Sequence, residues 1–425
     1  MKTLRIIVLL SVLALAVTAC QTTAEAPVEE ETTMEEESEV VEEEAAPPEV
    51  TITLWTQEGE SDNAYQFVVS LTDAYTAMYP NVTFEVVQKD TETLREDFQT
   101  ASLAGAAPDL LWTVSDHAGP FTTAGIIQSV DDYFDMDLYV PSVVMNGETW
   151  AVPISSGNHL MLIYNKDLIA EPPADTDELI AMGKELTHDD QYGLVFNATE
   201  PFFIAPWWGG FGGSVFADDG VTPTLNTEAM VNTLQFLYDL KFTHKITPES
   251  MDYDTADTLF KEGKAAMLIN GDWSLGGYQE LFGDKLGVAP LPKVTATDNY
   301  PAAYTSGKYF MLPKDLSGDK LDVVVDFISF ATNEENQLNQ LETLSRLPGL
   351  KAVLDDESIA SDPILAGSAE AMSYGVPMPT VVEMRCIWDA IKPEQTLVFA
   401  GSETPVDAAA AMQAAAEACV LTLEE

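Results

Sequence analysis

Segments rich in β-branched residues alternate with segments of helical periodicity from residue 50 onward. The run Val50–Trp55 predicts a strand, and apolar residues at helical spacing over 64–79 predict a helix. A strand over 82–87, a helix over 91–104 and a buried strand over 108–112 follow. This β-α-β-α-β order predicts a parallel sheet covered by helices, whose ligands bind at the carboxyl ends of the strands.

The same alternation continues through the rest of the chain, without an internal repeat. About 375 residues follow residue 50, which is more than one hydrophobic core normally holds, so two α/β domains are expected. The further strands are predicted over 149–154, 160–164, 193–197 and 265–270, and the further helices over 177–186, 227–242, 254–262, 321–331 and 405–421.

The first residues have the pattern of a secretory signal. Lys2 and Arg5 precede the apolar run 6–17, which is too short to span a bilayer comfortably. The sequence Val-Thr-Ala-Cys that ends at Cys20 resembles a bacterial lipobox, in which the cysteine is lipidated and anchors the mature chain. We therefore expect a signal peptide over 1–19. The alternative is ordinary cleavage near Ala19 with an incidental cysteine.

An acidic, low-complexity segment follows the leader. Residues 21–49 contain twelve glutamates, three prolines, no aromatic residue and no Lys or Arg. Such a composition cannot bury enough apolar surface to offset its ordering entropy. We expect residues 20–49 to be a lipidated cysteine and a disordered tether that holds the folded part away from the membrane. No later stretch is expected to cross a membrane.

The charge of the globular part limits its partners. Residues 50–425 carry 58 acidic and 17 basic side chains, which argues against nucleic acid and against anionic ligands. The four histidines lack metal-ligand spacing, and neither a phosphate-binding Walker loop nor a Gly-x-Ser-x-Gly elbow occurs in the sequence. No catalytic residue, metal or cofactor is therefore predicted. Cys386 and Cys419 form a disulfide in an oxidising compartment or remain two buried thiols.

Recognisable motifs lie in five stretches of the chain: 108–112 with 124–127, 162–168, 196–203, 260–273 and 375–392. Together these stretches resemble one protein family, the bacterial extracellular solute-binding proteins of the maltose/maltodextrin-binding type. The resemblance implies two α/β lobes with a ligand cleft between them, crossed by hinge strands near Ser155, Ala303 and Leu347. The N-lobe would comprise 50–155 and 304–346, and the C-lobe 156–303 and 347–425.

The resemblance also implies a function. The chain would be the monomeric binding component of an ATP-binding cassette (ABC) sugar importer, exported, membrane-anchored and not an enzyme. It would capture a neutral maltodextrin-like oligosaccharide for a membrane permease. A sugar presents hydroxyl groups and apolar C–H faces, so its site needs aromatic platforms and polar side chains.

The family's ligand-binding positions fall on specific residues of this chain. The expected aromatic platforms are Trp112, Phe202, Trp273 and Trp388, although core packing is the alternative for each tryptophan. The expected polar contacts are Gln57, Asp116, Glu200 and Lys392.

Two other functions stay open at this point. The acidic composition is compatible with a cationic ligand, such as a polyamine or a metal, which relatives of the fold bind. The carboxylates could also be the pair of a glycoside hydrolase, which needs two such groups at a set separation.

If Cys20 carries the lipid, the native protein should partition with membranes, and Cys20→Ala should release it into the soluble fraction. Fractionation of cells that express either form measures this. A Cys20→Ala protein that stays wholly with the membranes would refute the anchor.

Overall fold

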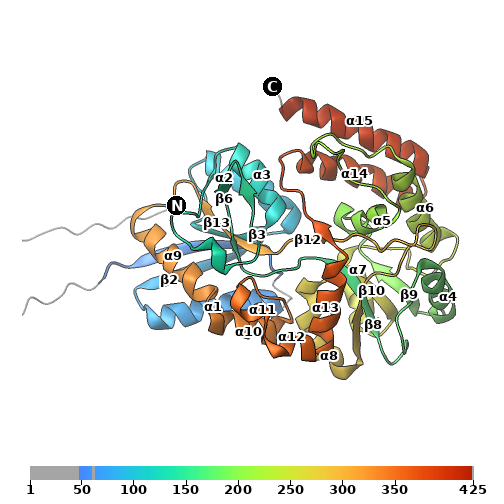
Figure 1. The fold of residues 1–425 in the computed structure, drawn as a ribbon, viewed down its shortest axis with the longest axis horizontal. Helices are drawn as coiled ribbons and strands as arrows, with labels where there is room; N and C mark the ends of the chain where they lie inside the picture. The colour runs from blue at the N-terminus through green and yellow to red at the C-terminus, as the bar shows by residue number, and fades with distance from the viewer. Residues whose placement is uncertain (1–46, 60–62, 424–425) are drawn as a thin grey trace, which may run out of the picture. The chain divides into compact units, whose positions relative to one another are not determined.

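The computed structural model describes residues 47–59 and 63–423. The predicted signal peptide, Cys20 and the tether up to residue 46 lie outside the described residues. The described part from Pro47 onward forms one compact unit in which helices surround two main sheets (Figure 1).

The first sheet contains the strands that the opening alternation predicts. Strand β1 (Val50–Thr56) pairs in parallel with β2 (Val82–Gln88) and β3 (Leu110–Val114), and its residues alternate between buried and partly exposed. Strand β13 (Lys308–Pro313) returns from far along the chain and runs antiparallel to β3. Within the described residues the order is β2-β1-β3-β13-β4, and β7 (Val152–Pro153) also pairs with β13.

Helices cover the first sheet because their apolar faces complete its core. Helix α1 (Asn63–Met78) buries Phe67, Val68, Leu71 and Tyr75, which belong to the same cluster as Ile52 and Leu54 of β1. The other helices that follow the strands of this sheet or pack beside α1 are α2 (Thr91–Leu103), α3 (Ala118–Thr123), α9 (Gly318–Ala331) and α10 (Glu334–Leu344).

The second sheet is buried on both faces. Its order within the described residues is β11-β8-β10-β9, and every residue of β8 and β10 is buried. Such strands read as continuous apolar runs because helices cover both faces. The strands are β8 (Leu160–Asn165), β9 (Tyr192–Phe196), β10 (Ala265–Gly271) and β11 (Leu286–Ala289).

Figure 1 shows the helices of this second half around its sheet, on the right of the view. They are α4 (Thr176–Leu186), α5 (Ala205–Gly210), α6 (Glu228–Phe242), α7 (Tyr253–Lys261), α8 (Leu275–Phe282), α13 (Pro363–Ser373), α14 (Met384–Phe399) and α15 (Pro405–Leu423). Short elements connect the two halves or lie at their edges: β4 (Ile127–Gln128), β5 (Val144–Met145), β6 (Glu148–Thr149), β12 (Tyr304–Thr305), α11 (Lys351–Leu354), α12 (Glu357–Ser361) and β14 (Val376–Pro377).

Three segments that link the two sheets hydrogen-bond to one another. The amide of Ile154 donates to the carbonyl of Lys308 over 2.7 Å, and the amide of Gly157 donates to Ser306 over 3.0 Å. The amide of Ser156 donates to the carbonyl of Leu347 over 2.9 Å. The connections between the halves therefore run side by side, which is the arrangement that a hinge requires.

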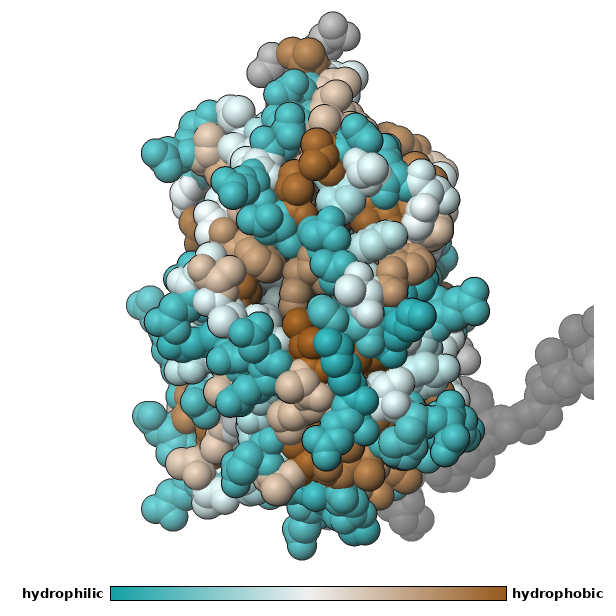
Figure 2. All heavy atoms as spheres, turned by 90° about the vertical axis from the view of Figure 1, so that its right-hand side faces the viewer, coloured by the Kyte–Doolittle hydropathy of each residue, from teal (hydrophilic) through white to brown (hydrophobic). Residues whose placement is uncertain are grey.

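The surface of the second half is largely hydrophilic. Figure 2 views this face, where most atoms are teal or pale and the apolar ones lie in separate groups between them. Such a surface agrees with the excess of acidic side chains in the sequence.

The sequence analysis expected that no stretch after the tether could cross a membrane, and helix α15 corrects this expectation. Its length and apolar composition are sufficient to cross one. Its contacts argue for a covering helix instead. Ala408, Ala409, Met412 and Ala416 are buried in the core of the second half, and α15 packs against α14 and α6. The sulfurs of Cys386 in α14 and Cys419 in α15 are bonded, with their Cα atoms 5.6 Å apart.

Loss of this disulfide should lower stability, because the bond closes a loop between positions 33 residues apart and restricts the unfolded chain. We expect the double variant Cys386→Ala/Cys419→Ala to lose about 2–4 kcal/mol in the free energy of unfolding. Urea unfolding of the exported domain measures this, and dithiothreitol should lower the stability of the parent alone. A loss below about 1 kcal/mol would contradict it.

Candidate functional site

A pocket lies between the two halves of the molecule and brings several predicted residues together. Its volume is about 110 Å³. Asp116 and His117 reach it from the carboxyl end of β3, while Trp388 and Lys392 reach it from α14. The predicted residues that line it are Asp116, Glu200, Phe202, Trp388 and Lys392.

Trp388 and Asp116 touch across the pocket. The indole N–H of Trp388 donates to the Asp116 carboxylate over 3.2 Å, and the ring lies edge-on to Tyr304 with 6.1 Å between centroids. Trp388 is half-buried, so part of its ring remains open. It can therefore offer a face to a ligand while its polar edge is already bonded.

Glu200 and Lys392 form the polar side of the same pocket. The ammonium of Lys392 lies 2.7 Å from a carboxylate oxygen of Glu200, and both side chains are partly exposed. Glu200 immediately precedes the short 3₁₀ turn Pro201–Phe203, whose proline starts the turn and directs Phe202 into the pocket wall. A paired carboxylate and ammonium can accept from and donate to neutral hydroxyl groups.

Trp273 stands beside this pocket and does not line it. Its ring centroid is 6.1 Å from that of Phe202, and its N–H donates to the hydroxyl of Tyr253 over 3.0 Å. The ring lies against the backbone of Gly271, where an added Cβ would come within 2.0 Å of it. Lys308 lies on the ring with its ammonium 5.7 Å from the centroid. The orientation of the indole is thus fixed on several sides.

Two predicted contacts occupy different surroundings from those expected. Trp112 is fully buried, packs edge-on against Phe310 at 5.1 Å and donates its N–H to Glu58 over 3.0 Å. Gln57 is also buried, and its side-chain oxygen accepts from Thr113 over 3.2 Å. Neither lines the pocket. The alternative of core packing describes Trp112 better than the platform role, because its side of β3 faces the helices that cover the first sheet.

A buried ion pair lies next to Trp112 and Trp273. One guanidinium nitrogen of Arg346 is 2.7 Å from the Glu58 carboxylate, and Arg346 is completely buried. Burial raises the pKa of Glu58, but the charges of Arg346 and Lys308 and its hydrogen bonds outweigh burial and lower the pKa to about 2. Arg346 also donates to the carbonyl of Trp273 over 3.4 Å. The pair therefore joins the end of β1 to the loop that carries Trp273.

The lip of the pocket brings the two halves into close contact. Arg95 of α2 lies 3.4 Å from Asp389 of α14. At Gly119 in α3 an added Cβ would lie 2.2 Å from the carbonyl oxygen of Thr380, so only glycine fits there. The two halves therefore touch each other directly at the lip of the pocket.

Comparison with known proteins shows which family the chain belongs to. Residues 70–367 match the family model described as bacterial extracellular solute-binding protein. The chain belongs to this family. Its members bind solutes outside the cell, so this solute-binding protein is exported and is not an enzyme, as the sequence predicted.

Similar proteins include a maltose/maltodextrin-binding domain from Bdellovibrio bacteriovorus bound to maltotriose. It is 36% identical, with a TM-score of 0.84, and the match covers 87% of this chain and all of that one. A maltotriose-binding protein of Pyrococcus abyssi is 28% identical over 78% of this chain and 74% of its own length. A maltooligosaccharide ABC transporter solute-binding lipoprotein of Streptococcus pneumoniae is 23% identical over 68% of this chain and 71% of that one. The two-lobed fold and the resemblance to maltodextrin-binding proteins are confirmed.

The pocket of the solute-binding protein is also lined by residues that the sequence prediction did not include, among them Arg95 and His117. Burial lowers the pKa of His117 to about 4, so its ring is neutral at pH 7. One ring nitrogen lies 2.7 Å from the hydroxyl of Thr113. The sequence could have indicated His117 as a pocket residue, because it directly follows the predicted contact Asp116. Nothing in the sequence of α2 indicated that Arg95 would line the pocket.

The described residues of the solute-binding protein contain no group of three or more His, Cys, Asp or Glu side chains that could hold a metal ion. Asp116 and Glu200 each have a hydrogen-bond partner in the pocket. The pocket therefore presents paired polar groups beside aromatic rings, which suits a neutral ligand.

The ion pair predicts a pH dependence of stability. The folded-state pKa of Glu58 is depressed from 4.5 to about 2, so its contribution is present above pH 4.5 and is lost as pH falls toward 2. Glu58→Gln leaves the buried guanidinium of Arg346 without its counter-charge and should cost about 3–5 kcal/mol at pH 7. Urea unfolding of parent and variant between pH 7 and pH 2 measures the difference, which should shrink below pH 4.5.

The matched control is Asp97→Asn, which removes a carboxylate from the partly exposed pair with Lys89. It should cost less than about 1 kcal/mol, because solvent screens such pairs. If Glu58→Gln costs no more than this control at pH 7, the buried pair does not have the assigned role.

Proposed function

We propose that this protein captures a neutral maltodextrin-like oligosaccharide between its lobes and delivers it to the permease of an ABC importer. The observation that carries the proposal is the pocket itself, in which the half-buried ring of Trp388 and the ring of Phe202 stand beside the Glu200–Lys392 pair. The maltotriose-bound relative from Bdellovibrio supports the sugar class.

The chemistry of the pocket fits a sugar ring. Indole and phenyl rings cover the apolar C–H faces, while hydroxyl groups exchange hydrogen bonds with the polar side chains. In this proposal Trp388, Phe202 and Trp273 are the platforms, and Asp116, Glu200 and Lys392 are polar contacts. Gln57 and Trp112 act behind the site, through Thr113 and Glu58.

We propose that the lobes comprise 50–155 with 304–346 and 156–303 with 347–425. The connecting segments that hydrogen-bond side by side at Ser156, Ser306 and Leu347 support hinge crossings there. In this proposal the contacts at the lip, including Arg95 with Asp389, belong to the closed state of the lobes. A ligand that bridges them would shift the protein toward this state.

Delivery requires that the protein stay close to the membrane. The lipobox-like sequence before Cys20 supports a lipid anchor with residues 21–49 as the tether. The streptococcal relative described as a lipoprotein adds support. We propose that the protein acts as a monomer, because one chain supplies both walls of the pocket.

The alternative of a cationic ligand has less support from the site. The Glu200 carboxylate already faces Lys392, and the Asp116 carboxylate accepts from Trp388. Arg95 and Lys392 also line the pocket, and each pairs with a carboxylate of the wall, Arg95 with Asp389 and Lys392 with Glu200. A cationic ligand would have to compete with these paired cations for the carboxylates, whereas a neutral sugar can hydrogen-bond to groups that stay paired.

Trp388→Ala and Trp273→Ala should each weaken binding of maltotriose by roughly tenfold to a few hundredfold. The reason is the loss of a stacking contact and of buried apolar area, at about 1.4 kcal/mol per tenfold. Isothermal titration calorimetry measures the affinity. Raising the salt concentration should change the affinity of the parent only slightly, because a neutral ligand has no charge to screen.

The matched control is Trp150→Ala. Trp150 is also half-buried, but it packs in the first half of the molecule and donates to the carbonyl of Met145. This variant should retain the parent affinity. The proposal would be wrong if Trp388→Ala and Trp273→Ala bound maltotriose normally, or if the parent bound spermidine and no sugar.

A further inference from the structure

The disulfide between Cys386 and Cys419 lies behind the helix that carries Trp388. Cys386 is completely buried in the first turn of α14, two residues before Trp388. Side chains two positions apart on a helix point to nearly opposite sides, about 200° apart. Since Trp388 lines the pocket, the bond to α15 holds α14 from the side that faces away from the pocket.

The first half of α14 supplies one wall of that pocket. Trp388, Asp389 and Lys392 all line it. The indole of Trp388 donates to Asp116, and Asp389 lies 3.4 Å from Arg95, so both reach the other half of the molecule. A small rotation or shift of this part of the helix would therefore displace the aromatic platform and both contacts together.

The first half of α14 lacks the usual stabilisation at both of its ends. Among the described residues, the side chain of Glu383 caps no amide at its start, whereas α4, α6, α7 and α13 each begin with a capping side chain. At its other end, Pro393 has no N–H to donate to the carbonyl of Asp389. Met384 and Ile387 pack in the core and hold one face, but they leave the two ends weakly fixed.

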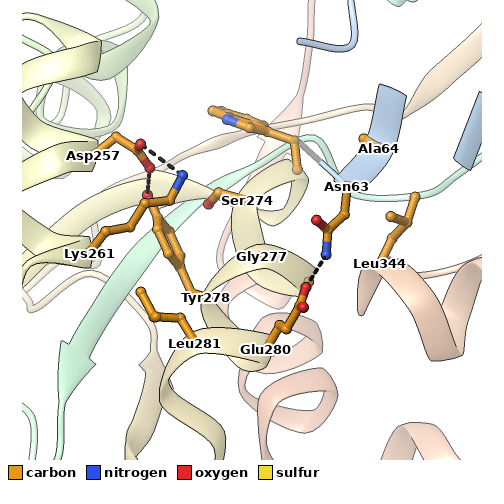
Figure 3. A pocket seen from close by; sticks show the side chains of 12 residues that line it. Asn63, Ala64, Asp257, Lys261, Ser274, Gly277, Tyr278, Glu280, Leu281 and Leu344 are labelled. Atoms are coloured by element: carbon orange, nitrogen blue, oxygen red, sulfur yellow. Dashed lines mark hydrogen bonds and ion pairs between the residues drawn. The ribbon is translucent and has the colours of Figure 1, made fainter. Parts of the chain in front are cut away.

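The wall on the other side of Trp273 is fixed in a different way. In the pocket of Figure 3, the hydroxyl of Tyr278 donates to Asp257 over 2.7 Å, and the ammonium of Lys261 lies 2.9 Å from the same carboxylate. These bonds connect α8 to α7 without a covalent link. At the start of α14 the disulfide takes the place of such a network.

We propose that the Cys386–Cys419 disulfide is a positioning element of the ligand site, which holds the first half of α14 so that Trp388 keeps its orientation toward the ligand. The proposal rests on the proposed function, and it assigns a role in binding to two residues that do not line the pocket. A ligand that binds the reduced protein must order this part of the helix itself, and that ordering lowers the affinity. The affinity would therefore follow the oxidation state of the pair.

The test compares the two states of the bond. Cys386→Ala/Cys419→Ala should bind maltotriose about five- to tenfold more weakly than the parent. Isothermal titration calorimetry measures this at a temperature where every variant is folded. Dithiothreitol tests the bond without mutation, because it reduces the disulfide to two thiols and itself closes to a cyclic disulfide. It should weaken binding by the parent to the same extent and leave the double variant unchanged.

The matched control for stability is Leu179→Ala. Leu179 is completely buried in α4 and belongs to the same core as α14, so its truncation also lowers stability. Because none of the residues that line the pocket belongs to α4, the affinity of this variant should stay within about twofold of the parent. An equal loss of affinity in this control would mean that the disulfide acts through general stability, and would overturn the proposal.

Two further measurements separate positioning from general support. In a Trp388→Ala background, removal of the disulfide should cost little further affinity, because the ring that it orients is already absent. Hydrogen exchange at the amides of residues 384–392 should be faster without the disulfide and unchanged in Leu179→Ala.

Unchanged exchange at these amides, an unchanged affinity of the double variant, or an equal affinity loss with and without Trp388 would each overturn the positioning role alone. A parent that binds no maltotriose would overturn the proposed function. The exchange rates of the ligand-free protein would then decide whether the bond orders this part of α14.

Discussion

The buried pair of Glu58 and Arg346 constrains the centre of the molecule. A guanidinium removed from water is tolerated only when its charge is balanced and its hydrogen bonds are made. Glu58 supplies that charge from the end of β1, and the carbonyl of Trp273 supplies a further acceptor from the other half. The position of the Trp273 loop is therefore tied to the first sheet through one side chain.

A further buried charge, Lys308, connects the Glu58–Arg346 pair to the ring of Trp273. Lys308 begins β13, is buried, and lies on the face of Trp273, while it also helps to lower the pKa of Glu58. Its own pKa is lowered because burial outweighs the attraction of Glu58. Two cations and a carboxylate thus fix the indole of Trp273 in place. These buried charges are separate from the charged pair of Glu200 and Lys392 that lines the pocket.

The sequence pattern predicted local structure well where the residues of one segment are enough to show which of its positions are buried. Strand β1 and helix α1 appear close to their predicted bounds, because their apolar residues recur with the period of the element. Strands β8 and β10 also appear close to their predicted bounds, because each is a short continuous apolar run. The predicted strand over 149–154 is instead two short pieces, β6 and β7. Strand β13 and helix α14 were not foreseen at all, since their partners lie far away in the sequence.

The same limit applies to the site. The neighbours Glu200 and Phe202 were recognisable from one local stretch, and the structure places both in the pocket. Trp112 is buried together with every other residue of β3, and its neighbour Leu111 belongs to a second core cluster on the other face of the strand. The sequence of the strand alone therefore does not distinguish a packed tryptophan from one at a ligand site. Glu58 and Arg346 are 288 residues apart, so no sequence window contains the pair.

The missing side chain at Gly119 has a consequence for the energetics of closure. The Cα of Gly119 approaches the carbonyl of Thr380 so closely that one methyl group would separate the lobes at that point. In the proposed function, such a methyl group would lie outside the lining of the pocket and would still lower the population of the closed state. Apparent affinity falls in proportion to that population. The solute concentration to which the importer responds can therefore be set by a residue that never meets the solute.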